Sequence, residues 1–74
     1  MRRVAVDSTS IVSIGYSVRK RELEIEFRPG GDIYRYFGVS PQEHIEFLAA
    51  ESKGTYLNRV FKSKDHPYKK ISDK

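Results

Sequence analysis

The residues best suited to chemistry are the basic side chains near the C-terminal end of the chain. Residues 53–74 hold seven lysines and arginines against two aspartates, whereas residues 1–52 hold seven basic and eight acidic side chains. Such cations bind phosphate groups, and a glycine-bearing turn that opens a helix can add backbone N–H donors. The predicted nucleic-acid site therefore consists of Lys53, Gly54, Asn58, Arg59, Lys62 and Lys64.

A purely structural interpretation of the same segment stays open. Gly54 can simply end one helix before the next, while Ser52 or Asn58 bonds to backbone groups between the helices. A second candidate is Tyr34-Arg35-Tyr36, where a basic side chain between two tyrosines is typical of a surface on which nucleic-acid bases stack. The strand register decides between stacking and burial for these tyrosines.

Catalytic and metal-binding chemistry has little support in the sequence. His44 and His66 lie far apart in a chain without cysteine, so no metal-ligand pattern is present. Ser8, Ser10 and Ser13 lack a nucleophile motif or a base placed by the sequence. We expect no enzyme activity, no catalytic residues, no metal and no small-molecule cofactor.

The first half of the chain predicts a three-stranded antiparallel meander. Apolar residues alternate with polar ones over 11–19 and more strictly over 22–28, which is the period of half-buried strands. The third strand is Ile33 to Phe37, after the turn at 29–32. Residues 2–6 are also β-prone, ahead of a turn-forming cluster at 7–10.

The hairpin tips predict the register. With tips at Lys20-Arg21 and Gly30-Gly31, Tyr16 and Tyr36 both face Ile25, and Tyr34 faces Phe27. Tyr16, Tyr34 and Tyr36 then form a structural core motif. Arg35 lies on the other face, opposite Glu26, which favours a cross-strand ion pair over an RNA contact. Ile33 and Phe37 share that wetter face.

Two short helices are predicted to follow and to pack on one face of the meander, giving an α+β fold. Ser40, Pro41 and Glu43 form a capping box that opens a helix running to Glu51. A second helix is expected over 55–62, ended by Asp65-His66-Pro67. We expect one domain over 1–74, with 69–74 as a flexible basic tail.

Composition also suggests where the protein resides. At 74 residues and net charge +4, the chain has no cysteine and no apolar run near the roughly 20 residues that span a bilayer. The absence of thiols fits a reducing compartment. We expect a soluble, cytoplasmic protein without membrane contact.

Several short motifs in a fixed order resemble the KTSC domain, a small family named after the C-terminal domain of some lysyl-tRNA synthetases. They are Ser8-Thr9-Ser10-Ile11, Ile14-Gly15-Tyr16, the strand 23–27, Tyr34-Arg35-Tyr36 with Gly38-Val39, and the run 52–58. His44 stands where such sequences are expected to carry an aromatic residue. The resemblance implies a free-standing bacterial domain without catalytic residues, for which RNA binding has been suggested.

Two functions are therefore predicted as alternatives. The first is an RNA-binding module that uses the basic C-terminal segment on phosphates. The second is a protein-interaction module, with a different protein or a second copy as its partner, which uses Ile33, Phe37 and the unpaired edges of the sheet.

Overall fold

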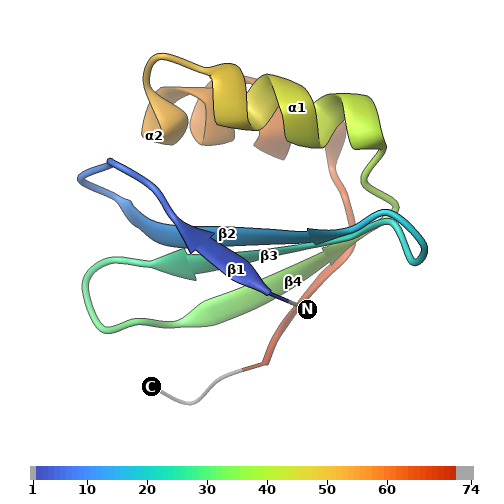
Figure 1. The fold of residues 1–74 in the computed structure, drawn as a ribbon, viewed down its shortest axis with the longest axis horizontal. Coiled ribbons are helices and arrows are strands. Elements are labelled where there is room, and N and C mark those ends of the chain that lie inside the picture. Colours follow the sequence, from blue (N-terminus) through green and yellow to red (C-terminus); the bar gives the residue numbers. More distant parts are fainter. Residues whose placement is uncertain (1, 72–74) are drawn as a thin grey trace.

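The protein is an antiparallel sheet with helices packed on one of its faces (Figure 1). The computed structural model describes residues 2–71. The strands pair in chain order, and they are β1 (Arg3–Ala5), β2 (Ile11–Ser17), β3 (Glu22–Phe27), β4 (Ile33–Phe37) and β5 (Tyr68–Lys70). The predicted α+β class is confirmed, but the sheet has five strands rather than three.

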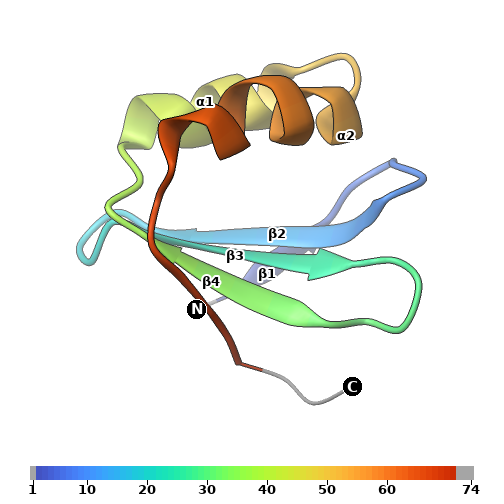
Figure 2. The ribbon, with the colours of Figure 1, turned by 180° about the vertical axis from the view of Figure 1, so that it is seen from behind.

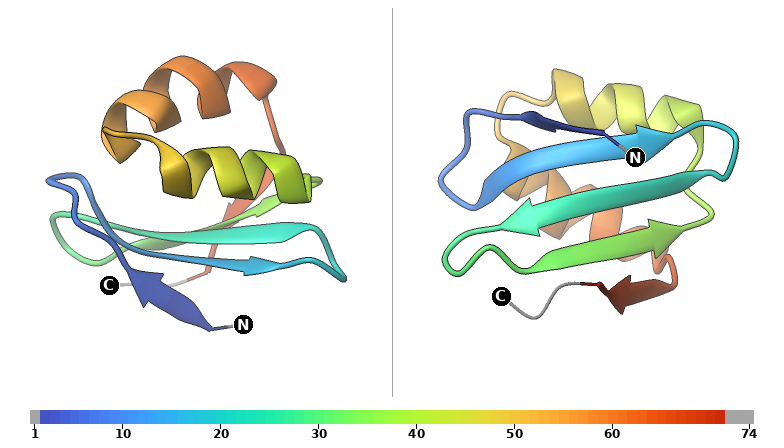
Figure 3. Two further views of the ribbon diagram at one scale, coloured as in Figure 1. Left: turned by 45° about the horizontal axis from the view of Figure 1, so that its top comes forward. Right: turned by 60° about the horizontal axis from the view of Figure 1, so that its bottom comes forward.

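The two additional strands form the edges of the sheet. β1 pairs with β2, and β5 returns from the last helical turn to pair with β4 (Figure 2 and Figure 3). The predicted flexible tail is therefore wrong for Lys69 and Lys70, which are strand residues, and the Ile71 N–H donates to the Ile33 carbonyl at 2.9 Å. The rest of that predicted tail, 72–74, lies outside the described residues.

The hairpin register differs from the predicted one by two residues. Tyr16 pairs with Leu23, and Leu23 also pairs with Tyr36 on its other side. The predicted two-residue tips are replaced by loops of four residues (18–21) and five residues (28–32). Arg21 in the first loop has φ 55°, and Gly30 and Gly31 in the second have positive φ. A shift of two residues preserves the face of every side chain, so the predicted faces hold from Ser13 onward. At a bulge between Ile11 and Ser13 the alternation breaks, and Ile11, opposite Phe27, is the buried residue.

The helical half begins with the predicted cap. Ser40 and Glu43 form a capping box at the start of α1 (Pro41–Ala49), with the Ser40 Oγ accepting from the Glu43 N–H at 3.2 Å. After a break, α2 (Lys53–Tyr56) continues into a π-helical turn η1 (Leu57–Phe61) and a 3-10 turn η2 (Lys62–Lys64). Within the described range, no helix is long and apolar enough to cross a membrane.

The core lies between the helices and the inner face of β2, β3 and β4. Phe47 of α1 and Phe61 of η1 are fully buried against the sheet, with ring centroids 5.6 Å apart. His44 stacks on Tyr16 with ring centroids 4.5 Å apart. Its imidazole ring therefore takes the place of the aromatic residue expected at position 44. The other buried apolar residues are Ile11, Ile14, Leu23, Ile25, Tyr36, Val39 and Leu57.

The outer face of the sheet, which the helices leave uncovered, is crossed by an ionic row. Glu24 is only 3% exposed because the side chains of Arg3 and Arg35 lie over it. Arg3 Nη1 lies 2.8 Å from one carboxylate oxygen, while Arg35 donates to the other from Nε at 3.0 Å and Nη2 at 2.7 Å. The predicted pairing of Arg35 with Glu26 is therefore wrong, as a direct result of the register shift.

Gly15 gives the ionic row its path across β2. A Cβ at this position would lie 2.8 Å from the Arg2 carbonyl oxygen and 2.8 Å from Arg3 Cγ. Because glycine leaves that space open, the Arg3 side chain crosses the strand and reaches Glu24. Arg3, Gly15, Glu24 and Arg35 are successive cross-strand neighbours, so one row of four residues ties β1 to β4.

Candidate functional site

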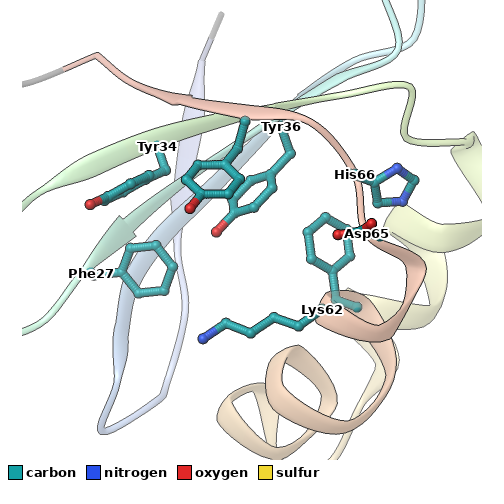
Figure 4. Close-up of a pocket in the computed structure, with 8 residues that line it drawn as sticks. Phe27, Tyr34, Tyr36, Lys62, Asp65 and His66 are labelled. Carbon is teal, nitrogen blue, oxygen red and sulfur yellow. The ribbon is translucent and has the colours of Figure 1, made fainter.

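A hollow lies where η1 and η2 pass over the β4 and β5 side of the sheet (Figure 4). Its volume is about 480 Å³. The sheet contributes four aromatic rings to its wall and the helical end contributes a ring, a lysine, an aspartate and a histidine. This aromatic pocket is lined by Phe27, Tyr34, Tyr36, Tyr68, Phe61, Lys62, Asp65 and His66.

The three tyrosines of the pocket come from neighbouring positions on two strands. Tyr36 pairs with Tyr68 across the β4–β5 ladder, and Tyr34 lies two residues along the same face. The ring centroids of Tyr34 and Tyr36 lie 5.7 and 5.6 Å from that of Tyr68. Tyr36 is 8% exposed and Tyr68 is 63% exposed, so the pocket has a closed inner wall and an open rim.

The hydroxyl groups of these three tyrosines have no hydrogen-bond partner among residues 2–71. The other two tyrosines do have one: the Tyr16 hydroxyl donates to the Val39 carbonyl at 2.6 Å, and the Tyr56 hydroxyl lies 3.3 Å from Glu46 Oε1. None of the three hydroxyls is among the buried side-chain atoms without a partner in the described chain, so they are open to solvent on the pocket side and available to a ligand.

The pocket keeps the Tyr36 phenol protonated. Burial, followed by the neighbouring phenols of Tyr68 and Tyr34, raises the pKa of Tyr36 to about 12. Tyr36 therefore remains a neutral phenol at neutral pH. The Lys62 side chain extends from the helical end toward the side of the pocket on which Phe27 lies (Figure 4). It makes no ion pair with a described residue, and its side chain is exposed.

A histidine–carboxylate pair fixes the far wall of the pocket. His66 Nε2 lies 2.6 Å from Glu43 Oε2, and both side chains are 12% exposed. Burial opposes the ionisation of Glu43, but the hydrogen bonds from His66 and Ser40 hold the pKa of this carboxyl below its ordinary value. The pair therefore ties the end of η2 to the start of α1 and holds the chain that leads into β5.

A second hollow, of about 430 Å³, lies at the opposite end of the helical segment. We call it the hydroxyl pocket because five serine and threonine residues line it. Gly54 packs here against Ser10, and a Cβ on the glycine would lie 3.2 Å from the Ser10 Oγ. Its lining residues are Asp7, Ser8, Thr9, Ser10, Glu51, Ser52, Lys53, Gly54, Thr55 and Asn58.

Four polar side chains of the hydroxyl pocket, those of Ser8, Ser52, Lys53 and Thr55, have hydrogen-bond partners within the described chain. The Ser52 Oγ accepts from the Thr55 N–H at 3.3 Å, and the Lys53 amine donates to the Ala50 carbonyl at 2.9 Å. The Ser8 Oγ accepts from the backbone of the following turn. These contacts agree with the structural interpretation of this segment, in which its polar groups hold the backbone.

The structure separates the residues of the predicted nucleic-acid site. Lys53, Gly54 and Asn58 line the hydroxyl pocket, and Lys62 lines the aromatic pocket. Arg59 and Lys64 are exposed and line neither hollow. Sequence reasoning missed Tyr68 and His66 as pocket residues. Both come after the helices and reach the pocket only because β5 returns to the sheet. The aromatic residue type at position 68 was the only feature of the sequence that could have indicated this.

Among residues 2–71 there is no group of three or more His, Cys, Asp or Glu side chains that could hold a metal ion.

The KTSC domain family matches residues 7–64, which is most of the chain.

The chain belongs to the KTSC domain family.

Relatives and a solved structure extend this finding over nearly the whole length. An uncharacterised protein of Stutzerimonas stutzeri (strain A1501) is 41% identical over 71 residues, covering 96% of this chain and 99% of the relative. A protein of Tsukamurella paurometabola is 37% identical over 57 residues, covering 77% and 84%. The crystal structure of a KTSC domain protein from Yersinia pestis is 42% identical, with a TM-score of 0.88 over 96% of this chain and 97% of that one.

The two segments that begin and end the resemblance to KTSC domains meet in space. Residues 8–11 and residues 52–58 are more than 40 positions apart, and both contribute to the hydroxyl pocket. The contact of Gly54 with Ser10 brings them together. The motifs of this KTSC domain thus include the attachment of its first turn to its second helix, and they also supply Phe27, Tyr34 and Tyr36 of the aromatic pocket.

Proposed function

We propose that this KTSC domain binds single-stranded RNA without catalysis, holding one base in the aromatic pocket and the flanking phosphates on nearby lysines. The observation that carries the proposal is the gathering of three tyrosine rings, whose hydroxyls lack partners in the described chain, beside the exposed amine of Lys62. Bases in single strands stack on aromatic side chains and hydrogen-bond through their edges, so they suit such a pocket.

The surrounding charge supports the same proposal. Lys62 and Lys64 of η2 are exposed, and Lys70 of β5, which shares its face with Tyr68, is paired only loosely with Asp32 at 3.6 Å. They lie on the two elements that form the rim of the pocket. A strand whose base enters the pocket would therefore run among cations, which attract phosphates and steer the approach of a polyanion. A cytoplasmic location, where RNA is abundant, belongs to this proposal.

A salt titration of RNA binding tests the proposal. Fluorescence anisotropy would follow a labelled single-stranded RNA of eight nucleotides and, in parallel, a fully paired duplex. If three phosphates are contacted, affinity for the single strand should fall about 20-fold between about 50 and 200 mM salt. Equal affinity for the duplex, or binding that salt does not change, would contradict it.

Two variants with one control separate the pocket from general charge. Lys62→Glu should weaken binding, and Tyr68→Ala should cost about 1–3 kcal/mol of binding free energy through lost stacking. The matched control is Lys20→Glu, an identical charge change at an exposed residue of the β2–β3 loop. If Lys20→Glu weakens binding as much as Lys62→Glu does, only net charge is involved and the pocket has no part.

A protein-interaction role is the second candidate, and the uncovered outer face of the sheet supports it. At the free edge of the sheet, Val4 of β1 is 63% exposed, although it lies on the face opposite to that of Arg3. Ile33 and Phe37 are half-buried on the same sheet, three strands away from β1. Measurement of the solution mass together with a pull-down tests this role: a strict monomer that recovers no partner would contradict it.

A further inference from the structure

The strand β1 forms one edge of the sheet and has a neighbouring strand on one side only. The Val6 N–H donates to the Val12 carbonyl at 3.1 Å, in the register of the β1–β2 ladder. Because the backbone groups of successive residues in a strand point to opposite sides, the N–H and C=O groups of Arg3 and Ala5 point away from β2. These groups face the free edge, where another strand can pair with them.

The two edges of the sheet differ in their protection against such pairing. At the opposite edge, β5 carries two lysines, and lysine on an edge strand opposes the approach of a second strand. In β1, Val4 and Ala5 are exposed, and the only charged side chain, that of Arg3, is neutralised by Glu24. Within residues 3–5, no side chain therefore repels a second strand.

An exposed apolar stripe on α1 lies on the same flank of the molecule. Figures 2 and 3 show α1 on the β1 side of the helical layer and the later helical turns on the β4 side. Glu43 and Glu46 of α1 contact side chains of those later turns and of the segment after them. At 100° per residue, Ile45 and Leu48 point to the opposite side of the helix, and they are 59% and 40% exposed.

We propose that two copies of this chain pair through their β1 edges, antiparallel about a two-fold axis at Val4, so that the two sheets become one continuous sheet. The strand bounds give the register: because β1 spans only Arg3–Ala5, an axis at Val4 pairs the whole strand with its copy. Arg3 then lies opposite Ala5 of the second copy. A second copy suits this edge because each free N–H group meets a free carbonyl.

The same arrangement removes apolar surface from water. Val4 points to the helix side of the sheet, as its ladder partner Ile14 does, and it is 63% exposed. At the axis the two Val4 side chains become direct neighbours, and the apolar stripes of the two α1 helices face each other above them. Val4, Ile45 and Leu48 are three of the six large apolar residues that are exposed within residues 2–71. Their burial favours association.

This inference is independent of RNA binding, and it narrows the protein-interaction role to one partner and one surface. The surface is the β1 edge with the helix side above it, rather than Ile33 and Phe37 on the outer face. The aromatic pocket lies on the β4 and β5 side of the sheet, away from the axis. A dimer of this kind therefore presents two open pockets.

Sedimentation equilibrium of the protein without RNA tests the inference. The chain has a mass of 8.6 kDa, and the average mass should rise toward twice that value between about 5 and 500 µM protein. Val4→Lys places two lysines against each other at the axis and should raise the dissociation constant at least about tenfold. The matched control is Val60→Lys, the same exchange at an exposed position of η1, which should leave the dissociation constant unchanged. Thermal melts confirm that both variants fold.

Cysteine crosslinking reports the register directly. The chain has no cysteine, so a single introduced thiol can form a disulfide only with a second copy. In the proposed pairing the two Cα atoms at position 4 lie about 4.5 Å apart, which is within the range of a disulfide. Under mild oxidation Val4→Cys should form a covalent dimer, whereas Lys69→Cys on the opposite edge strand should remain monomeric.

The outcomes separate this inference from the proposed function. A mass of 8.6 kDa at every concentration would overturn the inference and leave RNA binding unaffected. A dimer that Val4→Lys does not weaken, or crosslinking of Lys69→Cys instead of Val4→Cys, would overturn the assignment to β1. A chain that dimerises as described but does not bind RNA would overturn the proposed function alone.

Discussion

The substitution Gly15→Ala tests whether the ionic row on the outer face of the sheet requires a glycine at position 15. The added methyl would lie 2.8 Å from the Arg2 carbonyl oxygen and 2.8 Å from Arg3 Cγ, well inside contact distance. Either β1 moves away from β2 or the Arg3 side chain leaves its path to Glu24. Overpacking of this kind costs about 1–3 kcal/mol.

Loss of the Arg3–Glu24 contact would add to that cost. A hydrogen bond to a charged group contributes about 1.5–3 kcal/mol, although Glu24 would keep its two bonds to Arg35. We expect Gly15→Ala to lower the free energy of unfolding by about 2 kcal/mol, a decrease in Tm of about 8–16 °C for a domain of this size. Urea denaturation followed by circular dichroism measures both the midpoint and the slope.

A double-mutant cycle shows whether the Arg3 side chain is the cause. In an Arg3→Ala background Cγ is absent, so Gly15→Ala should cost less than it does in the wild-type chain. The remaining cost then reflects the Arg2 carbonyl oxygen alone. A Gly15→Ala variant within about 0.5 kcal/mol of wild type, the usual range for neutral surface changes, would refute the steric argument. An equal cost in both backgrounds would refute the part assigned to Arg3.

Three further predictions concern the helical half. Ser40→Ala removes the N-cap of α1 and should cost about 1 kcal/mol in urea denaturation; no loss would mean that the capping box does not stabilise the fold. Gly54→Ala should be neutral or stabilise by up to about 1 kcal/mol, because the helix gains a better former and the exposed Ser10 side chain can rotate away; a loss above 1 kcal/mol would show that the Gly54–Ser10 contact is rigid. Burial lowers the pKa of His44 below 6.5, so the unfolded chain takes up a proton there before the folded chain does, and stability falls as the pH drops below 6.5. His44→Phe should show a shallower fall over that range in thermal melts at stepped pH, and an unchanged slope would contradict the assignment.

The sequence predicts the faces of the central strands because alternation depends only on local order. The same alternation cannot fix the register to better than two residues, since a shift of two places every side chain on the same face. Loop length fixes the register. The first loop contains Arg21 in a left-handed conformation, which the residue type arginine does not predict. The capping box at Ser40, in contrast, is local and was predicted in full.

The candidate site depended on contacts that local patterns do not contain. Tyr68 reaches Tyr36 only because a three-residue strand returns to the sheet, and three residues are too few for alternation to reveal. The pair of His66 with Glu43 joins residues 23 positions apart. Lys62 was predicted as a phosphate contact from charge alone, and its place beside three tyrosine rings required the three-dimensional structure.

An NMR titration with single-stranded RNA tests the central claim most directly, because it locates the binding site without relying on any variant. On addition of an unlabelled uridine octanucleotide to the labelled protein, we predict shifts of the aromatic signals of Tyr34, Tyr36 and Tyr68 and of the signals of Lys62. Signals of the hydroxyl pocket around Ser10 and Gly54 should remain in place. Shifts confined to the hydroxyl pocket, or the absence of any shift at concentrations that saturate anisotropy, would contradict the account.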